Sequence, residues 1–432
     1  MAAKHTKTVL NCLIPAFLIG VLVLCAPEPK ETSDIEIPQQ KALENVITPE
    51  FVAVIPTPTP TKAAVLATDP SPMPTPTEVP IRDRDMPEEI DLTFERFDEE
   101  TYPEPTPGIF QMGYYLRSEP SRLAERTTWV RYGTRVYIKG RCVNVFNEPW
   151  YYVSADVDGQ YVEGYAQCST TQISDWLRPT PGPVSLVDVD VIQNPQAKHG
   201  PDRDGDGVYV VVLDPGHGGK YPGATCFGTK EKDINLQVGK YLRDYLESHY
   251  RNVVVYMTRS GDYVYDEWDP DDDLEYRARF AMQKEADLVL SLHFNAYDGR
   301  QIGSMVLVGT NPQVSEQERL FASYLLEEMG KIGLNKTGIK RKKSAMMRDK
   351  YGNLMDGYLM VRLPSEVGIP SVIIEHCFMD SRYDRMFWDT DEKINRLAEG
   401  DAYAIAAYLD LERIPDPPGS DDDLEADSEP ET

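Results

Sequence analysis

The sequence predicts two folded parts: an α/β domain with a mixed, largely parallel twisted sheet flanked by helices, and a smaller all-β barrel before it. Short apolar, β-branched runs alternate with amphipathic segments over residues 208–412, as in α/β domains. Aromatic and apolar runs separated by turns fill residues 108–176, a pattern typical of small barrels. The length of 432 residues also favours more than one domain.

The larger part contains five expected strands and four expected helices. Each strand is a short apolar run bounded by turn residues, and the helices carry apolar residues at 3.6-residue spacing. In the first helix, for example, Ile234, Val238 and Leu242 share one face. The expected strands are 208–214, 253–258, 287–293, 303–309 and 369–376, and the expected helices are 231–249, 274–285, 315–330 and 391–412.

The segments outside the two folded parts are predicted to be an export signal or anchor, a stalk, a linker and a tail. Residues 1–25 join a positive start to an apolar run, which indicates a signal peptide or a membrane anchor. Residues 26–107 hold nearly half of the 34 prolines and predict a disordered stalk. Residues 177–207 are expected to be a linker and 413–432 an acidic disordered tail. We therefore expect the folded parts in the cell envelope outside the cytoplasm, secreted or tethered to the membrane by the N-terminal segment.

Charge and cysteine content exclude some functions. A net charge of −27 argues against a nucleic-acid partner. None of the six cysteines forms a CxxC pair, which disfavours a cysteine zinc cluster, although export permits a Cys142–Cys168 disulfide.

The dense basic run 336–350 is either a contact for wall anions or a solvated loop. Residues 202–207 resemble the start of a calcium loop, but Leu213 stands where the last glutamate is needed, which favours a polar turn.

Two histidines follow buried strands. His217 comes directly after the apolar run that ends at Leu213, within a glycine-rich turn, and His293 ends a second apolar run. Side chains at the carboxyl ends of strands in one sheet can converge on a site. His376 is expected to point away from its neighbour Glu375, because side chains alternate along a strand.

Two carboxylates complete this group. Glu231 lies in the first turn of the helix after the His217 loop, where it can turn back to that loop. The alternative is an acid placed there only by the helix dipole. Two histidines and one carboxylate, with one position open, form a catalytic zinc set. Glu375 ends an apolar strand, where an unpaired carboxylate is costly, and it fits a general base.

Four motifs carry a family resemblance. LDPGHGG, GTKEKDINL, SLHFNA and PSVIIEHCFMD occur in this order within residues 208–412. This set resembles the zinc-dependent N-acetylmuramoyl-L-alanine amidases, the type 3 amidase family. The resemblance implies Zn²⁺ held by His217, Glu231 and His293, catalysis by Glu375, and substrate binding by Arg277 and Asn295.

The resemblance also implies a reaction on peptidoglycan. Zinc-activated water, with the glutamate as general base and acid, would cleave the amide between the lactyl group of N-acetylmuramic acid and L-alanine of the stem peptide. A zinc peptidase acting on the stem peptide, or a non-catalytic wall-binding protein, are the alternatives. The chain departs from the family in a long acidic loop, 263–273, which is a candidate for regulation, and in the pair His376-Cys377.

The earlier part resembles a different family. LRSEPS, YGTRVYI, PWYYVS and GQYVEGYA follow one another in residues 108–176 and resemble a bacterial SH3-like domain. The resemblance implies binding to wall peptides. Wall type, physiological role and oligomeric state stay open at this point.

Overall fold

The computed structural model describes residues 90–173, 186–190, 200, 202–348 and 354–415. The predicted leader 1–25, the stalk up to residue 89 and the tail from residue 416 lie outside the described residues. Within the described ranges, no helix combines the length and apolar character needed to cross a bilayer.

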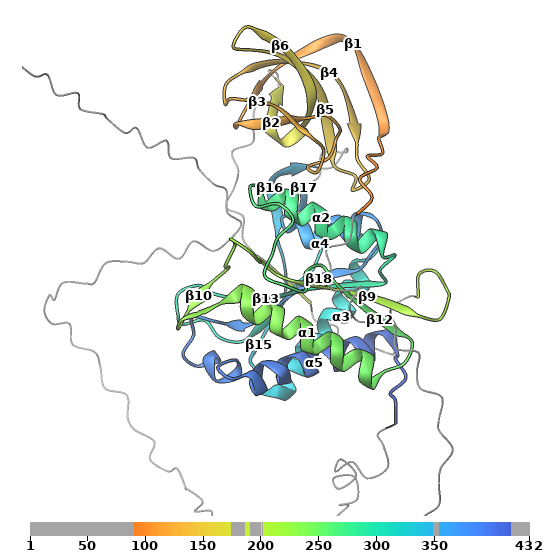
Figure 1. The fold of residues 1–432 in the computed structure, drawn as a ribbon, viewed down its shortest axis with the longest axis vertical. Helices are drawn as coiled ribbons and strands as arrows, with labels where there is room; N and C mark the ends of the chain where they lie inside the picture. Colours follow the sequence, from red (N-terminus) through yellow and green to blue (C-terminus); the bar gives the residue numbers. More distant parts are fainter. Residues whose placement is uncertain (1–89, 174–185, 191–199, 201, 349–353, 416–432) are drawn as a thin grey trace, which may run out of the picture. The chain divides into compact units, whose positions relative to one another are not determined.

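The α/β domain is built on a seven-stranded sheet with the strand order β12-β9-β13-β18-β14-β15-β8 (Figure 1). Strands β12, β9, β13 and β18 run parallel, β14 runs antiparallel to β18, and β8 runs antiparallel to β15. The prediction of a mixed, largely parallel sheet is therefore confirmed. The strands are β8 Val187–Val189, β9 Tyr209–Pro215, β12 Val253–Met257, β13 Leu288–Asn295, β14 Ser304–Leu307, β15 Lys336–Arg341 and β18 Ser371–Phe378.

Helices cover both faces of this sheet. Helices α1, α3 and α5 pack on one face around a large apolar cluster, and α2 and α4 pack on the other (Figure 1). Apolar strands covered on both faces explain the continuous β-branched runs in the sequence. The helices are α1 Glu231–His249, α2 Pro270–Gln283, α3 Ser315–Ile332, α4 Leu359–Glu366 and α5 Asp391–Leu409, with a short 3-10 turn, η3, at Asp384–Phe387.

Several expected boundaries are corrected. Helix α2 begins at Pro270 and not at residue 274, because Asp269 caps it and proline is tolerated in the first turn. The end of the expected acidic loop is thus helical. Strand β8 lies within the expected linker 177–207. The basic run forms β15 and β16 (Lys343–Arg348), which pairs with β17 (Leu354–Asp356), and is not a plain loop.

The N-terminal part is a seven-stranded antiparallel sheet with its own apolar core, which includes Phe110, Leu116 and Ile138. Strand β1 starts at Phe97, so the boundary expected at residue 107 is too late. The all-β character is confirmed, and the likeness to SH3-like domains stays a prediction. Its elements are β1 Phe97–Phe110, β2 Tyr114–Arg117, β3 Arg126–Val130, β4 Arg135–Val143, β5 Pro149–Val157, β6 Gln160–Gln167, η2 Cys168–Thr170 and β7 Thr171–Ile173.

Cys142 and Cys168 are free thiols in the structure, so the permitted disulfide is not formed. Cys142 lies in β4 and Cys168 begins η2. Burial raises the pKa of the Cys142 thiol to about 12, which keeps it protonated at neutral pH.

Buried ion pairs connect this β-sheet segment to helices α2 and α4. Glu148, which is 0% exposed, accepts two hydrogen bonds from Arg122 at 2.6 and 2.8 Å and one from Arg362 at 2.5 Å. Burial alone would raise the pKa of Glu148, but the two guanidinium groups lower it to about 2. Arg117 likewise pairs with Asp272 of α2 at 2.7 Å.

Candidate active site

His217 occupies a sharp turn at the carboxyl end of β9. Its backbone is left-handed, with φ of 63°, and Gly218 follows with φ of 133°. A left-handed conformation is costly for histidine and persists where surrounding contacts enforce it, as at functional sites. Asp262 supplies one such contact, because its carboxylate accepts from the Gly219 amide at 2.8 Å and from the Lys232 ammonium at 2.5 Å.

Glu231 is the first residue of α1 and turns back toward this loop. The β10–β11 hairpin (Thr225–Cys226 and Thr229–Lys230) precedes it and sets the start of the helix. The Glu231 carboxylate accepts from the Ala224 amide at 2.8 Å and is only 4% exposed. Placement at the helix start alone would leave it in solvent, so the alternative of a simple dipole-favoured acid does not explain its burial.

Glu231 joins the two predicted histidines. Its Oε2 lies 3.1 Å from His217 Nε2, and its Oε1 lies 2.9 Å from His293 Nδ1. The imidazole rings stand at 76° with centroids 4.9 Å apart. One donor atom from each of the three residues falls within 4.8 Å of the others. Two imidazoles and a carboxylate converging on one point fit a zinc ion with an open position.

The electrostatics favour the protonation states that bind a metal. Burial lowers the pKa of His293, which favours the neutral imidazole. Burial opposes ionisation of Glu231, but the adjacent His217 and His293 hold the pKa of this carboxyl well below its usual range. Metal ligands must be deprotonated, and the directions of these two pKa shifts favour that state in His293 and Glu231.

Two glycines make room for the three candidate ligands. A Cβ added at Gly216 would overlap the His293 imidazole, and one added at Gly223 would overlap the side chains of Glu231 and His217. A larger residue at either position would push a ligand out of place.

Glu375 lies beside this group on β18. It is the register partner of His293 across the parallel pair β13–β18, so the two side chains emerge on the same face of the sheet. Its Oε2 is buried and accepts no hydrogen bond within the described part of the protein. Burial, with a contribution from the Glu231 charge, raises the pKa of Glu375 well above its usual range. An unpartnered carboxylate with raised proton affinity is suited to proton transfer.

A buried network behind the His217 loop fixes its position. Arg277 donates to the His217 carbonyl at 2.8 Å and pairs with Asp214 at 2.9 Å and Asp273 at 2.8 Å. Asp214 also accepts from the hydroxyls of Thr258 and Ser291, both at 2.6 Å. The expected role of Arg277 in substrate binding stays a prediction, since the contacts that the structure gives it are to protein groups.

Sequence reasoning assigned no role to Asp214. The signal that identified Glu375, a carboxylate within an apolar strand, applies equally to Asp214. Asn295, the other residue expected to bind substrate, ends β13, and its Oδ1 accepts from the Ala296 amide at 2.8 Å. Its role also stays a prediction.

His376 points to the opposite side of β18 from Glu375, as alternation predicts. It is 0% exposed and places Nε2 2.8 Å from Asp401 Oδ2 on α5 and Nδ1 3.0 Å from the His293 carbonyl. The Phe294 ring stacks on the imidazole with centroids 5.0 Å apart. The unusual His376 therefore links the backbone of one candidate metal ligand to a buried carboxylate.

Two other acidic segments have local partners. The carboxylates of Asp202, Asp204 and Asp206 lie within 4.8 Å of one another, and they accept backbone amides of their own turn. This geometry agrees with the polar turn expected there. In the loop 263–273, Asp266 pairs with Arg126 at 3.2 Å, and Asp273 accepts from the Tyr265 amide at 2.6 Å. Regulation by this loop stays a prediction.

Comparison with known proteins identifies the family to which the α/β domain is similar. The sequence model of a family described as N-acetylmuramoyl-L-alanine amidase matches residues 211–407. The endolysin of Bacillus phage SPP1 is 30% identical over 207 residues, which cover 47% of this chain and 67% of that protein. The amidase CwlM of Bacillus licheniformis is 27% identical over 203 residues, 47% of this chain and 70% of that protein. This chain belongs to the N-acetylmuramoyl-L-alanine amidase family.

Among solved structures, the amidase AmiC2 of Nostoc punctiforme aligns with 26% sequence identity and a TM-score of 0.37, covering 47% of this chain and 97% of that one. The sequence matches above extend over the α/β domain that carries the His217, Glu231 and His293 group.

Proposed function

We propose that this protein is a zinc-dependent peptidoglycan hydrolase that cleaves the amide between the lactyl group of N-acetylmuramic acid and L-alanine of the stem peptide. Membership of the amidase family supports the reaction class. One observation carries the mechanism: His217, Glu231 and His293 converge on one point, with Glu375 in register beside them.

The four residues divide into two roles. His217, Glu231 and His293 would hold the metal through neutral imidazoles and one carboxylate. When bound, zinc supplies Lewis acidity, which polarises a carbonyl and lowers the pKa of water to about 7. Glu375 accepts a proton from the attacking water as the new C–O bond forms. It then donates that proton to the alanine nitrogen as the C–N bond breaks, so the leaving group departs as a neutral amine.

The surrounding network keeps the ligands in place during this cycle. Arg277 and Asp214 hold the His217 loop from behind, and the His376–Asp401 pair holds the His293 backbone. Outer partners of this kind orient metal ligands. We further infer an extracytoplasmic location, because the wall substrate lies there, and a wall-binding role for the N-terminal β domain.

The test is the substitution Glu375→Gln, which keeps the shape of the side chain and removes its proton transfer. Purified wall is digested with each variant, and the products are identified by mass spectrometry. We expect the wild type to release stem peptides that begin with free L-alanine. The variant should lose at least about a hundredfold in rate, the usual contribution of general acid–base catalysis. Metal content should stay near one zinc per chain.

Glu327→Gln is the matched control, because Glu327 is exposed on α3 and, among the described residues, is paired with Lys331 alone, at 3.6 Å. It should retain full activity. Wild-type activity in Glu375→Gln would overturn the assignment of this residue. Cleavage between stem residues would instead identify a zinc peptidase, and a zinc-loaded wild type that cleaves no wall would identify a binding protein.

A further inference from the structure

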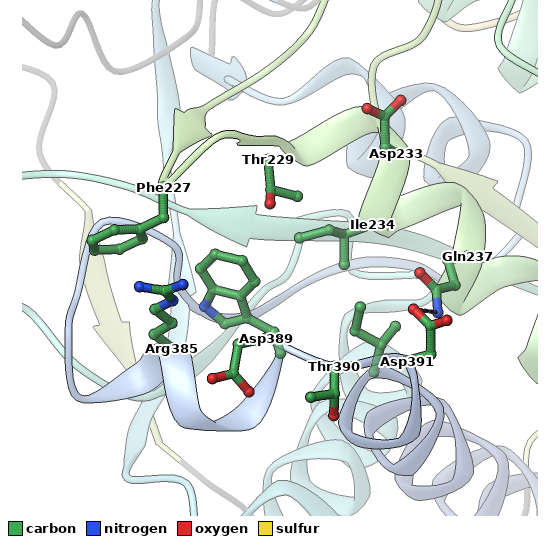
Figure 2. Close-up of a pocket in the computed structure, with 11 residues that line it drawn as sticks. Phe227, Thr229, Asp233, Ile234, Gln237, Arg385, Asp389, Thr390 and Asp391 are labelled. Carbon is green, nitrogen blue, oxygen red and sulfur yellow. Dashed lines mark hydrogen bonds between the residues drawn. The ribbon is translucent and has the colours of Figure 1, made fainter.

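A pocket lies beside the tip of the β10–β11 hairpin and the first turns of α1. It has a volume of about 220 Å³ and lies between the hairpin, α1 and the turn from η3 to α5 (Figure 2). Its lining includes Phe227, Ile234, Arg385, Trp388 and Ile394, and none of the four proposed catalytic and metal-binding residues. The hairpin and the start of α1 are thus shared between this pocket and the candidate active site.

The pocket combines an apolar floor with two donors that lack acceptors. Ile234, Trp388 and Ile394 are 2%, 3% and 5% exposed. The Trp388 indole N–H is buried and has no hydrogen-bond acceptor among the described residues. An orphaned buried donor is costly, and an acceptor from a ligand would satisfy it.

Arg385 provides the second donor. Its guanidinium lies 4.8 Å from the centre of the exposed Phe227 ring, next to which it is drawn in Figure 2, and it forms no ion pair with a carboxylate in the described ranges. Two acids of the pocket have other hydrogen-bonded partners: Asp389 pairs with Lys393 at 2.7 Å, and Asp391 accepts from Gln237 at 3.1 Å. The hydrogen bond from Lys393 chiefly lowers the pKa of Asp389, and the Arg385 charge also contributes, but no hydrogen bond joins the Arg385 and Asp389 side chains in the described ranges. The carboxylate of Asp233 points away from the pocket in Figure 2. Arg385 is therefore available to a ligand.

These features favour a peptide carboxylate over a sugar. A sugar ring stacks on an open aromatic face, but Trp388 is almost completely covered and the exposed Phe227 ring already has the Arg385 guanidinium against it. A carboxylate accepts from a guanidinium and an indole N–H together, and a small apolar side chain beside it suits the isoleucine floor. The pocket is smaller than the 300 Å³ or more typical of drug-sized ligands, so it admits about one residue.

We infer that this pocket binds the C-terminal carboxylate and terminal alanine of a peptidoglycan stem peptide. The inference rests on the proposed function for its substrate class. It extends the recognised substrate beyond the scissile bond to a pocket that shares the β10–β11 hairpin and the start of α1 with the candidate active site. Phe227 and Arg385 would act in specificity and take no part in the chemistry.

The experiment measures binding of a free stem peptide, which is a product and needs no turnover. The probe is L-Ala-γ-D-Glu-L-Lys-D-Ala as the free acid and as its C-terminal amide, titrated into the zinc-loaded full chain by calorimetry. We expect the peptide amide to bind about tenfold more weakly than the free acid, because a tenfold change in affinity corresponds to the loss of about one charge-assisted hydrogen bond. Arg385→Gln should lower the affinity for the free acid by a similar factor and leave the affinity for the peptide amide unchanged.

Arg382→Gln is the matched control, because Arg382 is exposed in the same turn and does not line the pocket. It should bind both peptides as the wild type does. Trp388→Phe keeps an aromatic ring and removes the N–H. It should lower the affinity for the free acid more than the affinity for the peptide amide. Equal binding of acid and amide, or an Arg385→Gln variant with wild-type affinity for the acid, would overturn the inference. The inference would also be overturned if N-acetylglucosamine oligomers bind to the wild type and this binding is lost in the Arg385→Gln variant. None of these outcomes depends on amide cleavage, so the proposed function stands or fails separately.

Discussion

Asp214 offers a direct test of how the His217 loop is held. The substitution Asp214→Asn keeps the size of the side chain and removes its charge. Asp214 is 1% exposed and lies 2.9 Å from Arg277, which is itself 3% exposed. The substitution therefore leaves a buried guanidinium with Asp273 as its remaining carboxylate partner.

The expected cost follows from this geometry. Removing one partner of a buried ion pair typically costs 3–5 kcal/mol, and the surviving Asp273 contact places this case near the lower limit. The hydroxyls of Thr258 and Ser291 can rotate to suit an amide, so their bonds contribute little to the loss. We expect the free energy of unfolding to fall by about 3 kcal/mol, or about 6–12 °C in Tm for a domain of this size.

The pH dependence supplies a second measurement. Burial alone would raise the pKa of Asp214, but Arg277 and the two hydroxyl donors lower it below its ordinary value. A carboxyl with a depressed folded-state pKa stabilises the fold above its unfolded pKa of about 3.9, and this stabilisation is lost as the pH falls through the folded value. Asp214→Asn should therefore lose less stability than the wild type between pH 5 and pH 2.

The assay is chemical denaturation across this pH range, together with zinc affinity from chelator competition. Because Arg277 also bonds the His217 carbonyl, zinc affinity should fall along with stability. Glu327→Gln removes a pair whose side chains are 56% and 60% exposed, and it should cost less than about 0.5 kcal/mol. An Asp214→Asn variant no less stable than Glu327→Gln, with unchanged zinc affinity, would refute this reasoning.

Two further substitutions test the other buried pairs. Glu148→Gln should lower the free energy of unfolding at pH 7 by about 3 kcal/mol, because the pKa of Glu148 in the folded protein is about 2. The ionised carboxylate stabilises the fold fully above the pKa of an unfolded glutamate, and this stabilisation is lost as the pH falls toward 2. Denaturation curves measure this, and a loss below about 1 kcal/mol would contradict it. Asp401→Ala removes the acceptor of His376, so zinc affinity should fall about tenfold in chelator competition. Unchanged zinc affinity in a folded Asp401→Ala protein would show that the pair does not orient His293.

The parts of the fold with a strong local pattern could be predicted from the sequence. Helix α1 has the bounds expected from its apolar spacing, Glu231–His249. Strands β9 and β13 lie within about two residues of their expected ends, because turn residues bound them. Helix α4 has eight residues and contains Pro364, so its pattern was too short to recognise. Strand β8 has three residues and exists only through its pairing with β15.

The candidate site shows the same division. The convergence of His217 and His293 follows from strand order, because both lie at the carboxyl ends of adjacent parallel strands. The supporting contacts depend on side chains far apart in sequence, such as Asp214 with Arg277 or His376 with Asp401. Spacing along one chain does not encode such pairings, so the buried network became visible only in the structure.

The reversed direction of β14 has a practical use. Since β14 runs antiparallel to β18, its carboxyl end lies at the opposite end of the strands from the candidate metal ligands. The loop that follows contains the exposed residues Pro312 and Gln313. A fluorescent label or affinity tag inserted between them would follow the protein in living cells while sparing the residues proposed to bind metal and substrate, because exposed loop tips tolerate insertion.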